Sequence, residues 1–290
     1  MHAHLITCLN GAFMPAEKAM IPVADRGFRL GDGVFENIRL TAGIPYQWAL
    51  HLNRLHEGIS ALRMTPPAVD WQSIARQLIA MNNAREGFLR LAISRGVGSY
   101  GYLPVTGIAA NWVMEYLPPI PTPAAPFSLW MGARERPSLA ALPMNYKIAH
   151  GIGSTLALLE AHEQGCDDAL MLTSTGHLCE AASASLFWCS RGRLFTPALA
   201  TGCLAGTTRA AVLRLSPLPV EEVCVKPEAL EEADMLFVSN TRLDVWPVSQ
   251  LLPVGRRYPT SHAVFRDIHA RLAADRAAYV ATHQGEWAAG

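Results

Sequence analysis

Two ionisable residues in the second half of the chain stand among apolar or small neighbours. Lys147 lies in "LPMNYKIAHGIGS", and Glu180 lies in "HLCEAASASLFW". A lysine that loses its hydration has a lowered pKa, and its amine can form a Schiff base with an aldehyde. A carboxylate with small neighbours leaves room for a flat ligand and could pair with a protonated ring nitrogen. Taken alone, each residue is better explained as a solvated surface side chain.

The octapeptide "GCLAGTTR", residues 202–209, has the composition of a helix start that binds an anion. Gly202 and Gly206 bracket an apolar loop, and Thr207 and Thr208 precede an apolar run. The first amides of a helix lack partners within the helix, the helix dipole favours negative charge there, and glycines allow close approach of a phosphate. The alternative is an ordinary capped helix in which Thr207 or Thr208 is the N-cap.

Three further residues could complete a phosphate site. Arg54 lies on the flank of an expected amphipathic helix in "HLNRLHEG", and a guanidinium donates two parallel hydrogen bonds to a phosphate. Asn240 and Thr241 follow an expected strand in "VSNTRLDVWPV". The alternatives are a solvated arginine and a plain loop. Together these residues supply an amine, a carboxylate and phosphate donors, which is the combination that pyridoxal phosphate needs.

The elements that must position these residues fall into two parts, separated by a proline-rich stretch at 117–126. We expect a small domain over residues 1–116. Its pattern predicts a strand pair around Asn10–Gly11, a second pair with a turn near Gly43, helices over 48–62 and 71–81, and a strand in "FLRLAISRG". Pro66–Pro67 ends the first of these helices. The small domain is therefore predicted to be a two-layer α/β structure.

The larger domain is predicted over residues 127–290 and is rich in strands. We expect a strand in "FSLWMGA", a helix in "GIGSTLALLEAHEQG", three strands between 167 and 197, a helix that starts at the octapeptide, a strand in "DMLFVSN", and a long amphipathic C-terminal helix. These elements predict a barrel-like, β-rich core with helices outside. The fold class is therefore α+β.

The composition shows no strong charge bias. The chain has 290 residues, of which 50% are hydrophobic and 17% charged, and its formal net charge is +0. We therefore expect neither nucleic acid nor a membrane as a partner. The six cysteines form neither a C-x-x-C pair nor a zinc-finger spacing, so we expect no metal site. The N-terminus lacks a signal-peptide pattern and no apolar run reaches membrane-spanning length, so the sequence predicts a cytoplasmic protein.

The motifs together resemble the class IV pyridoxal-phosphate enzymes, of fold type IV, which include branched-chain and D-amino acid aminotransferases and aminodeoxychorismate lyase. The matching segments occur in family order from about Asp25 to about Val248. They are "DRGFRLGDGVFENIRL", "HLNRL", "LRLAISRGVGSYGY", "NYKIAHGIGSTLALLEAHEQGCDDALML", "GHLCEAASASLFW", "TPALATGCLAGTTRAAVL" and "VSNT". The resemblance implies a small α/β domain, a larger barrel-like domain and a homodimer.

The resemblance also implies roles for single residues. Lys147 matches the Schiff-base lysine that moves the proton, and Glu180 matches the carboxylate that keeps the pyridine nitrogen protonated. Leu204 matches the apolar residue against the pyridine ring, and Phe35 matches an aromatic residue near the substrate. The residues that match the phosphate site are Arg54, Thr207, Thr208, Asn240 and Thr241.

The reaction is predicted from smaller differences. "FENIR" is closer to the branched-chain pattern than to the lyases, and "KIAHG" does not match the lyase pattern, whereas "ISRGVGSYGYLP" is more lyase-like. We therefore expect an aminotransferase that exchanges an amino group between an amino acid and a 2-oxo acid. The alternatives are an aminodeoxychorismate lyase, which releases 4-aminobenzoate and pyruvate, and a non-catalytic pyridoxal-phosphate-binding protein. Candidates for binding a substrate carboxylate are Arg39, Arg90 and Tyr100.

Overall fold

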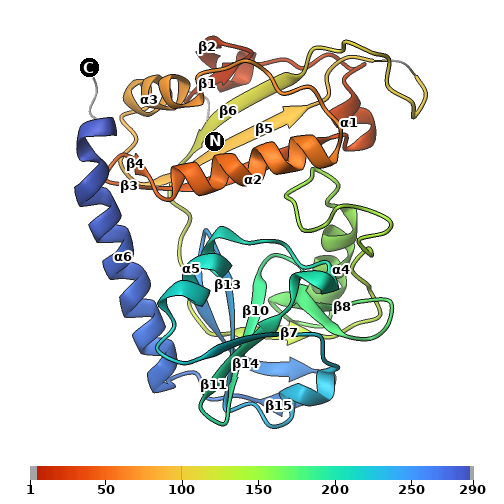
Figure 1. The fold of residues 1–290 in the computed structure, drawn as a ribbon, viewed down its shortest axis with the longest axis vertical. Coiled ribbons are helices and arrows are strands. Elements are labelled where there is room, and N and C mark those ends of the chain that lie inside the picture. Colours follow the sequence, from red (N-terminus) through yellow and green to blue (C-terminus); the bar gives the residue numbers. More distant parts are fainter. Residues whose placement is uncertain (1–4, 99, 288–290) are drawn as a thin grey trace. The chain divides into compact units, whose positions relative to one another are not determined.

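A computed structural model describes residues 5–98 and 100–287 of the chain. His4, where the first predicted strand begins, and Ser99, in the predicted lyase-like loop, lie outside the described residues. The chain forms two compact units, both drawn in Figure 1. The first comprises Met1–Ile120, Tyr146–His150 and Arg276–Gly290, and the second comprises Pro121–Asn145 and Gly151–Asp275.

The first unit contains a six-stranded antiparallel sheet in the order β2-β1-β6-β5-β3-β4. The strands are β1 (Ile6–Leu9), β2 (Ala12–Pro15), β3 (Gly33–Thr41), β4 (Ile44–Pro45), β5 (Gly87–Ser94) and β6 (Asn111–Leu117). The predicted turns at Asn10–Gly11 and near Gly43 are confirmed, because both glycines have positive φ, 90° and 81°. β6 was not predicted, and it lies between β1 and β5.

Helices cover one face of this sheet, which makes the unit two-layered as predicted. They are α1 (Arg26–Leu30), α2 (Trp48–Ala61) and α3 (Trp71–Met81). Figure 1 shows α2 and α3 against the sheet, where α2 contacts β3 and α3 contacts β1 and β6. The Asp70 side chain caps α3 by accepting from the Ser73 amide. Leu55 and Ile59 are buried on the apolar stripe of α2.

The second unit contains a nine-stranded sheet with the path β12-β11-β10-β13-β14-β7-β8-β9, and β15 pairs with β14. The strands are β7 (Phe127–Trp130), β8 (Asp168–Leu172), β9 (Leu178–Ala181), β10 (Ser185–Ser190), β11 (Arg193–Pro197), β12 (Val220–Val223), β13 (Met235–Asn240), β14 (Asp244–Leu252) and β15 (Arg256–Arg257). β7 runs parallel to both β14 and β8, so the sheet is mixed.

The prediction of three strands between 167 and 197 was wrong, because this stretch forms four. The chain breaks at 182–184, so that β9 pairs with β8 while β10 pairs with β11 and β13. Buried Asp168 holds the break by accepting from the Ser183 hydroxyl at 2.5 Å. The sequence "EAASAS" has no glycine or proline to reveal this corner.

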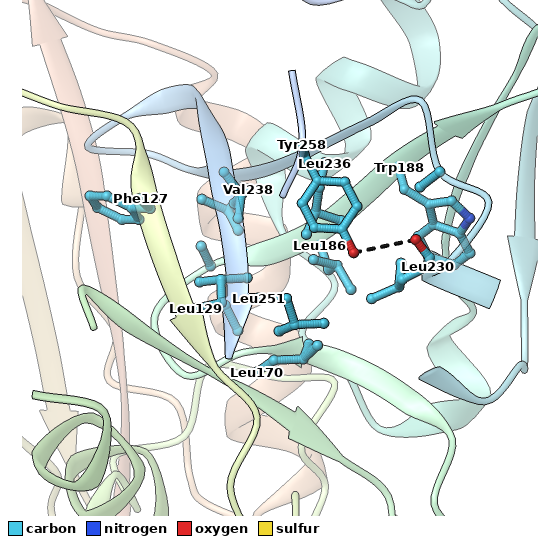
Figure 2. Packing of buried hydrophobic residues seen from close by; sticks show 14 of the residues in the cluster. Phe127, Leu129, Leu170, Leu186, Trp188, Leu230, Leu236, Val238, Leu251 and Tyr258 are labelled. Carbon is cyan, nitrogen blue, oxygen red and sulfur yellow. Dashed lines mark hydrogen bonds between the residues drawn. The ribbon is translucent and has the colours of Figure 1, made fainter. Parts of the chain in front are cut away.

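The core of the second unit lies on its sheet, and Figure 2 shows how it packs. Leu170, Leu186, Leu236 and Val238 are buried there, and the Tyr258 hydroxyl donates to the Leu230 carbonyl at 3.3 Å. The remaining helices are α4 (Ile152–Glu163), α5 (Thr207–Leu215) and α6 (Ala263–Trp287), and short 3₁₀ helices occupy Ala16–Lys18, Leu199–Thr201 and Pro227–Leu230. The architecture is α+β, with a curled, half-barrel sheet in the larger part.

The first compact unit is built from three separate stretches of the chain. The chain passes from the first unit to the second at Ile120–Pro121, but Tyr146–His150 and Arg276–Gly290 also belong to the first unit. A short β-bridge joins Val34 to Ile148, and the Trp48 amide donates to the Tyr279 hydroxyl at 3.2 Å. Long-range pairings of this kind cannot be read from composition. The boundaries given above at 116 and 127 remain a prediction.

Candidate active site

Lys147 is fixed to the edge of β3 by backbone hydrogen bonds. Its carbonyl accepts from the Phe35 amide at 3.0 Å, and the Ala149 amide donates to the Gly33 carbonyl at 2.8 Å. The side chain is half-buried, and its Nζ lies 4.3 Å from the centroid of the Phe35 ring. The amine therefore lies against an aromatic face beside a strand, and is not the fully solvated side chain of the alternative interpretation.

Phe35 shares its face of the sheet with the predicted substrate arginines. Residues 35, 37 and 39 of β3 are half-buried and alternate with fully buried neighbours. The Arg90 guanidinium lies 4.6 Å from the centroid of the Phe35 ring, and its Nη1 donates to Asn37 Oδ1 at 3.2 Å. The Arg39 guanidinium lies 5.6 Å from the Phe88 centroid. Lys147, Phe35 and Arg90 are thus brought together, with Arg39 further along the same face.

Tyr100 lies apart from that group in the described contacts. Its side chain is 94% exposed, and the guanidinium of Arg29 stacks 4.6 Å from its ring centroid. Arg26 holds the loop in place by donating to the carbonyls of Gly101 and Tyr102 at 2.9 and 2.7 Å. A role for Tyr100 in binding a substrate carboxylate remains a prediction.

Arg54 is a buried residue that pairs with a glutamate, which excludes the solvated arginine of the alternative interpretation. Its Nε and Nη2 donate to the two oxygens of Glu36 at 2.7 and 2.6 Å. His51 Nδ1 donates to the same carboxylate at 2.7 Å. Burial opposes ionisation of Glu36, but the hydrogen bonds from His51 and Arg54 and the charge of Arg54 prevail and lower its pKa to about 2. The carboxylate is therefore ionised at neutral pH.

His51 completes this cluster as a neutral donor. Its ring is buried, and burial is the main cause that lowers its pKa, although the Glu36 carboxylate raises it. A carboxylate only accepts, so Nδ1 carries the proton in this hydrogen bond. Arg54 is therefore the cation that neutralises Glu36, and the pair fixes the orientation of the guanidinium.

Glu180 lies on β9 in the second unit, and both of its oxygens have partners there. Oε1 lies 2.7 Å from Nη2 of Arg136, and Oε2 accepts from the Leu204 amide at 3.0 Å. The side chains of Glu180 and Arg136 are 6% and 10% exposed. The solvated carboxylate of the alternative interpretation is excluded. The carboxylate also accepts from the backbone of Leu204, which the family resemblance predicts to lie beside the pyridine ring.

The octapeptide forms the start of α5 as predicted, but neither threonine caps it. The N-cap is Gly206, and in the part of the chain that the structure describes no side chain caps the first amides of this helix. A Cβ on Gly206 would lie 3.1 Å from Ser185 Oγ, so only glycine fits there easily. Thr207 is buried and Thr208 half-buried at the helix start. The alternative of an ordinary threonine cap was therefore wrong.

Two serines lie beside this helix start. Ser185 on β10 pairs with Ser239 on β13, and residues on directly opposite positions point to the same face. Ser239 is 1% exposed, and its hydroxyl has no hydrogen-bond partner among the described residues. Buried hydroxyls are rarely left unpaired, so this one suits a ligand oxygen. Asn240 and Thr241 follow directly in the chain.

Asn240 holds its own turn. Its Oδ1 accepts from the amides of Arg242 and Leu243 at 3.0 and 2.8 Å, and its Nδ2 donates to the Ser183 carbonyl at 3.1 Å. The side chain thereby ties the end of β13 to the break after β9. Direct binding of phosphate by Asn240 and Thr241 remains a prediction.

Sequence reasoning missed the partners of the predicted residues. These are Glu36 and His51 beside Arg54, Arg136 beside Glu180, and Ser185 and Ser239 beside α5. "FENIR" contains Glu36 at a position that alternation buries, which was the one usable signal. Nothing in "RERPS" distinguishes Arg136 from the exposed Arg134.

Two further findings concern metals and membranes. Within residues 5–98 and 100–287, no cluster of three or more histidine, cysteine, aspartate or glutamate side chains could hold a metal ion. Among the described helices, none is long and apolar enough to cross a membrane.

The fold and these residues define a class of protein that comparison identifies. The branched-chain aminotransferase of the archaeon Thermoproteus uzoniensis, solved with norvaline, superposes with a TM-score of 0.88. It is 21% identical, and the match covers 96% of this chain and 97% of that one, which establishes the fold. The family model for amino-transferase class IV matches residues 33–251. The chain therefore belongs to the class IV aminotransferases and is an enzyme of that family.

Both aminotransferases and a lyase are among the relatives that are similar to the chain. A putative branched-chain-amino-acid aminotransferase of Methanocaldococcus jannaschii is 29% identical over 84% of this chain and 86% of its own length. An aminodeoxychorismate lyase of Vibrio harveyi is also 29% identical, over 79% of this chain and 86% of its own length. Overall identity thus does not separate the two reactions, and the residues of the site must do so.

Proposed function

We propose that the protein is a pyridoxal-phosphate-dependent aminotransferase that moves an amino group between an amino acid and a 2-oxo acid. The observation that carries this proposal is the environment of Lys147. The chain has three lysines, of which Lys18 and Lys226 are exposed. Lys147 alone of the three lies half-buried against an aromatic ring, on backbone bonded to β3. Its amine would form the Schiff base.

The residues present fit pyridoxal phosphate. The uncapped start of α5, the glycine at its N-cap and the unpartnered Ser239 hydroxyl suit a phosphate. The buried Glu180 carboxylate suits a protonated ring nitrogen. When bound, the cofactor supplies an electron sink for a carbanion at the substrate Cα.

Each residue would have a separate task. Glu180 would hold a proton on the ring nitrogen, and Leu204 would pack against the ring. The Lys147 amine would carry the proton to and from the substrate Cα. The phosphate would be held by Arg54, Thr207, Thr208, Asn240 and Thr241, with Glu36 orienting the Arg54 guanidinium.

The substrate end is proposed from the arginines on the sheet face. Arg90 lies beside Phe35 and is held by Asn37, so its guanidinium is oriented before a ligand arrives. A guanidinium binds a carboxylate through two parallel hydrogen bonds, and Arg90 would do so, with Arg39 and Tyr100 as further candidates. Phe35 would form the apolar wall between this cation and the Lys147 amine.

A lyase is the second candidate, and one observation favours it. The Vibrio harveyi aminodeoxychorismate lyase has the same sequence identity to this chain, 29%, as the Methanocaldococcus jannaschii aminotransferase. The motifs "FENIR" and "NYKIAHG" support the aminotransferase, because they depart from the lyase pattern.

We further propose a cytoplasmic homodimer. All six cysteines are free, which suits a reducing compartment. Ile152, Leu156 and Leu159 form an exposed apolar stripe along α4 at helical spacing. A second copy would cover this stripe, and sedimentation of the parent and of Leu159→Glu would test the dimer, which the charge should dissociate.

The experiment that tests the function follows the spectrum of the bound cofactor. The purified protein is mixed with a panel of L- and D-amino acids without a keto acid. We expect at least one amino acid to remove the yellow absorbance and a 2-oxo acid to restore it. Formation of 4-aminobenzoate and pyruvate from aminodeoxychorismate, without bleaching by any amino acid, would instead establish the lyase. Bound cofactor with neither reaction would indicate a binding protein.

A further inference from the structure

A buried arginine stands behind the carboxylate that is proposed to face the cofactor ring. Arg136 Nη2 lies 2.7 Å from Glu180 Oε1, and both side chains are at least nine-tenths buried. The same guanidinium lies 3.5 Å from the carbonyl oxygens of Gly202 and Met144. Arg136 is thus surrounded by three segments that precede or contain predicted site residues.

The backbone at Arg136 is hydrogen-bonded to the end of the sheet. Its amide donates to the Leu172 carbonyl at 2.8 Å, and Glu135 bridges to Leu172 in parallel. Leu172 ends β8, the strand that pairs with β9, where Met171 is opposite Glu180. The backbone segments that carry Arg136 and Glu180 are therefore both hydrogen-bonded to β8.

The pair fixes the charge state of Glu180. A guanidinium remains protonated at all pH values that proteins tolerate, and a carboxylate beside it is stabilised as the anion. The Leu204 amide, on the other oxygen, favours the same state. A buried ion pair adds little to stability compared with apolar residues of the same volume, so stability alone gives a weak reason for this one.

We propose that Arg136 is a positioning residue for the reaction. It holds Glu180 ionised and turned toward the ring nitrogen, so that the proton resides on the nitrogen and not on the carboxylate. Without the guanidinium, the neutral arrangement, with the proton on Glu180 and the nitrogen uncharged, becomes the favoured one in a buried site. The ring would then lose much of its capacity to accept electrons. This inference rests on the proposed function.

The test measures where the proton lies. The holoenzyme is prepared with cofactor labelled with ¹⁵N at the ring nitrogen, and the ¹⁵N chemical shift is followed from pH 6 to pH 9. Parent, Arg136→Met, Arg136→Lys and Arg134→Met are compared. Arg134 is the matched control, because it lies two residues before Arg136 in the same segment. Its ion pair with Glu160 is exposed.

We expect the parent and Arg134→Met to keep the shift of a protonated nitrogen throughout. In Arg136→Met the ¹⁵N chemical shift should move toward that of an unprotonated ring nitrogen. Arg136→Lys keeps the charge but loses the planar fork, so its shift should lie between those of the parent and Arg136→Met. The rate of the half-reaction should fall about tenfold to a hundredfold in Arg136→Met, the size of effect seen when a residue that orients a metal ligand is removed.

The outcomes separate this inference from the proposed function. If Arg136→Met does not fold, Arg136→Lys decides, and a displaced ¹⁵N shift supports the proposal. Shifts in the folded Arg136 variants equal to that of the parent would overturn it. If the parent itself does not bind pyridoxal phosphate through Lys147, the proposed function fails, and that result is seen before any variant is measured.

Discussion

Each unit buries one glutamate beside an arginine, and the two pairs differ in what surrounds the carboxylate. Glu36 in the first unit is fully buried and accepts from the Arg54 fork and from His51, which are all side chains. Glu180 in the second unit accepts from the Arg136 guanidinium and from the backbone amide of Leu204. Both carboxylates are paired, but only Glu180 is tied to the loop that leads into α5.

This difference indicates different tasks for two chemically identical groups. Glu36 is enclosed by donors that lower its pKa to about 2, so it serves as a fixed counter-charge that orients Arg54. Glu180 is proposed to keep a proton on the ring nitrogen of the cofactor. The partners of a buried carboxylate therefore indicate its role. Burial alone does not tell a structural carboxylate from a catalytic one.

Of the substitutions that test this comparison of the two glutamates, Glu180→Gln should have the largest effect. A neutral amide stabilises a protonated ring nitrogen much less than a carboxylate does, so the half-reaction at saturating cofactor should slow about 10²- to 10⁴-fold. Single-turnover absorbance measures this rate, and equilibrium titration should show cofactor affinity falling much less. An unchanged rate would remove Glu180 from the mechanism.

Glu36→Gln should act on the fold instead. Removing the carboxylate leaves Arg54 buried without its counter-charge, so the free energy of unfolding should fall by about 3 to 5 kcal/mol. Urea denaturation measures it. The control is Glu57→Gln on the exposed side of the same helix as Arg54, which should change stability by less than about 0.5 kcal/mol. A Glu36 variant as stable as this control would show that the pair is not the counter-charge described here.

The pH dependence of the free energy of unfolding should also report on the Glu36–Arg54 pair. The pKa of Glu36 is lower in the folded chain, about 2, than the ordinary value of 4.5. Its contribution, about 3 kcal/mol, is therefore present above pH 4.5 and is lost as the pH falls from 4.5 toward 2. Unfolding measured between about pH 3 and pH 6 should depend less steeply on pH in Glu36→Gln than in the parent. Equal slopes would contradict the assignment.

The smallest of these effects is expected for the conservative change Arg54→Lys. A lysine keeps the charge for Glu36 but cannot present the same fork, so cofactor affinity should weaken by about 1.5 to 3 kcal/mol. Fluorescence titration of the apoprotein with pyridoxal phosphate measures this change. Affinity equal to that of the parent would show that Arg54 does not contact the phosphate.

The sequence predicted those elements that local patterns determine. The stripe of α2, the start of α3 at Trp71 and the turn at Asn10–Gly11 all involve neighbours within a few residues, and the structure has them where they were expected. β14 was missed because Pro247 interrupts its pattern, although Pro247 pairs with Phe237 in the sheet. β6 was missed where it leads into the proline-rich stretch.

The site was predictable as a set of residue types but not as a set of contacts. Lys147, Glu180 and the octapeptide stood out because their neighbours are small or apolar. Arg136 could not be found, because its pairing with Glu180 depends on how β7, β8 and β9 are ordered in the sheet. The burial of Arg54 likewise depends on Glu36, whose strand pairs with β5 and lies beneath α2.

The measurement that tests the central claim most directly is the mapping of the cofactor linkage. The holoenzyme is reduced with borohydride and digested, and the peptide that carries the pyridoxyl group is identified by mass spectrometry. Lys18 and Lys226 are exposed and serve as internal controls for non-specific labelling. We predict that the group is attached to Lys147 in full and that Lys147→Ala abolishes the linkage. Attachment to Lys18 or Lys226, with Lys147 unmodified, would contradict the account.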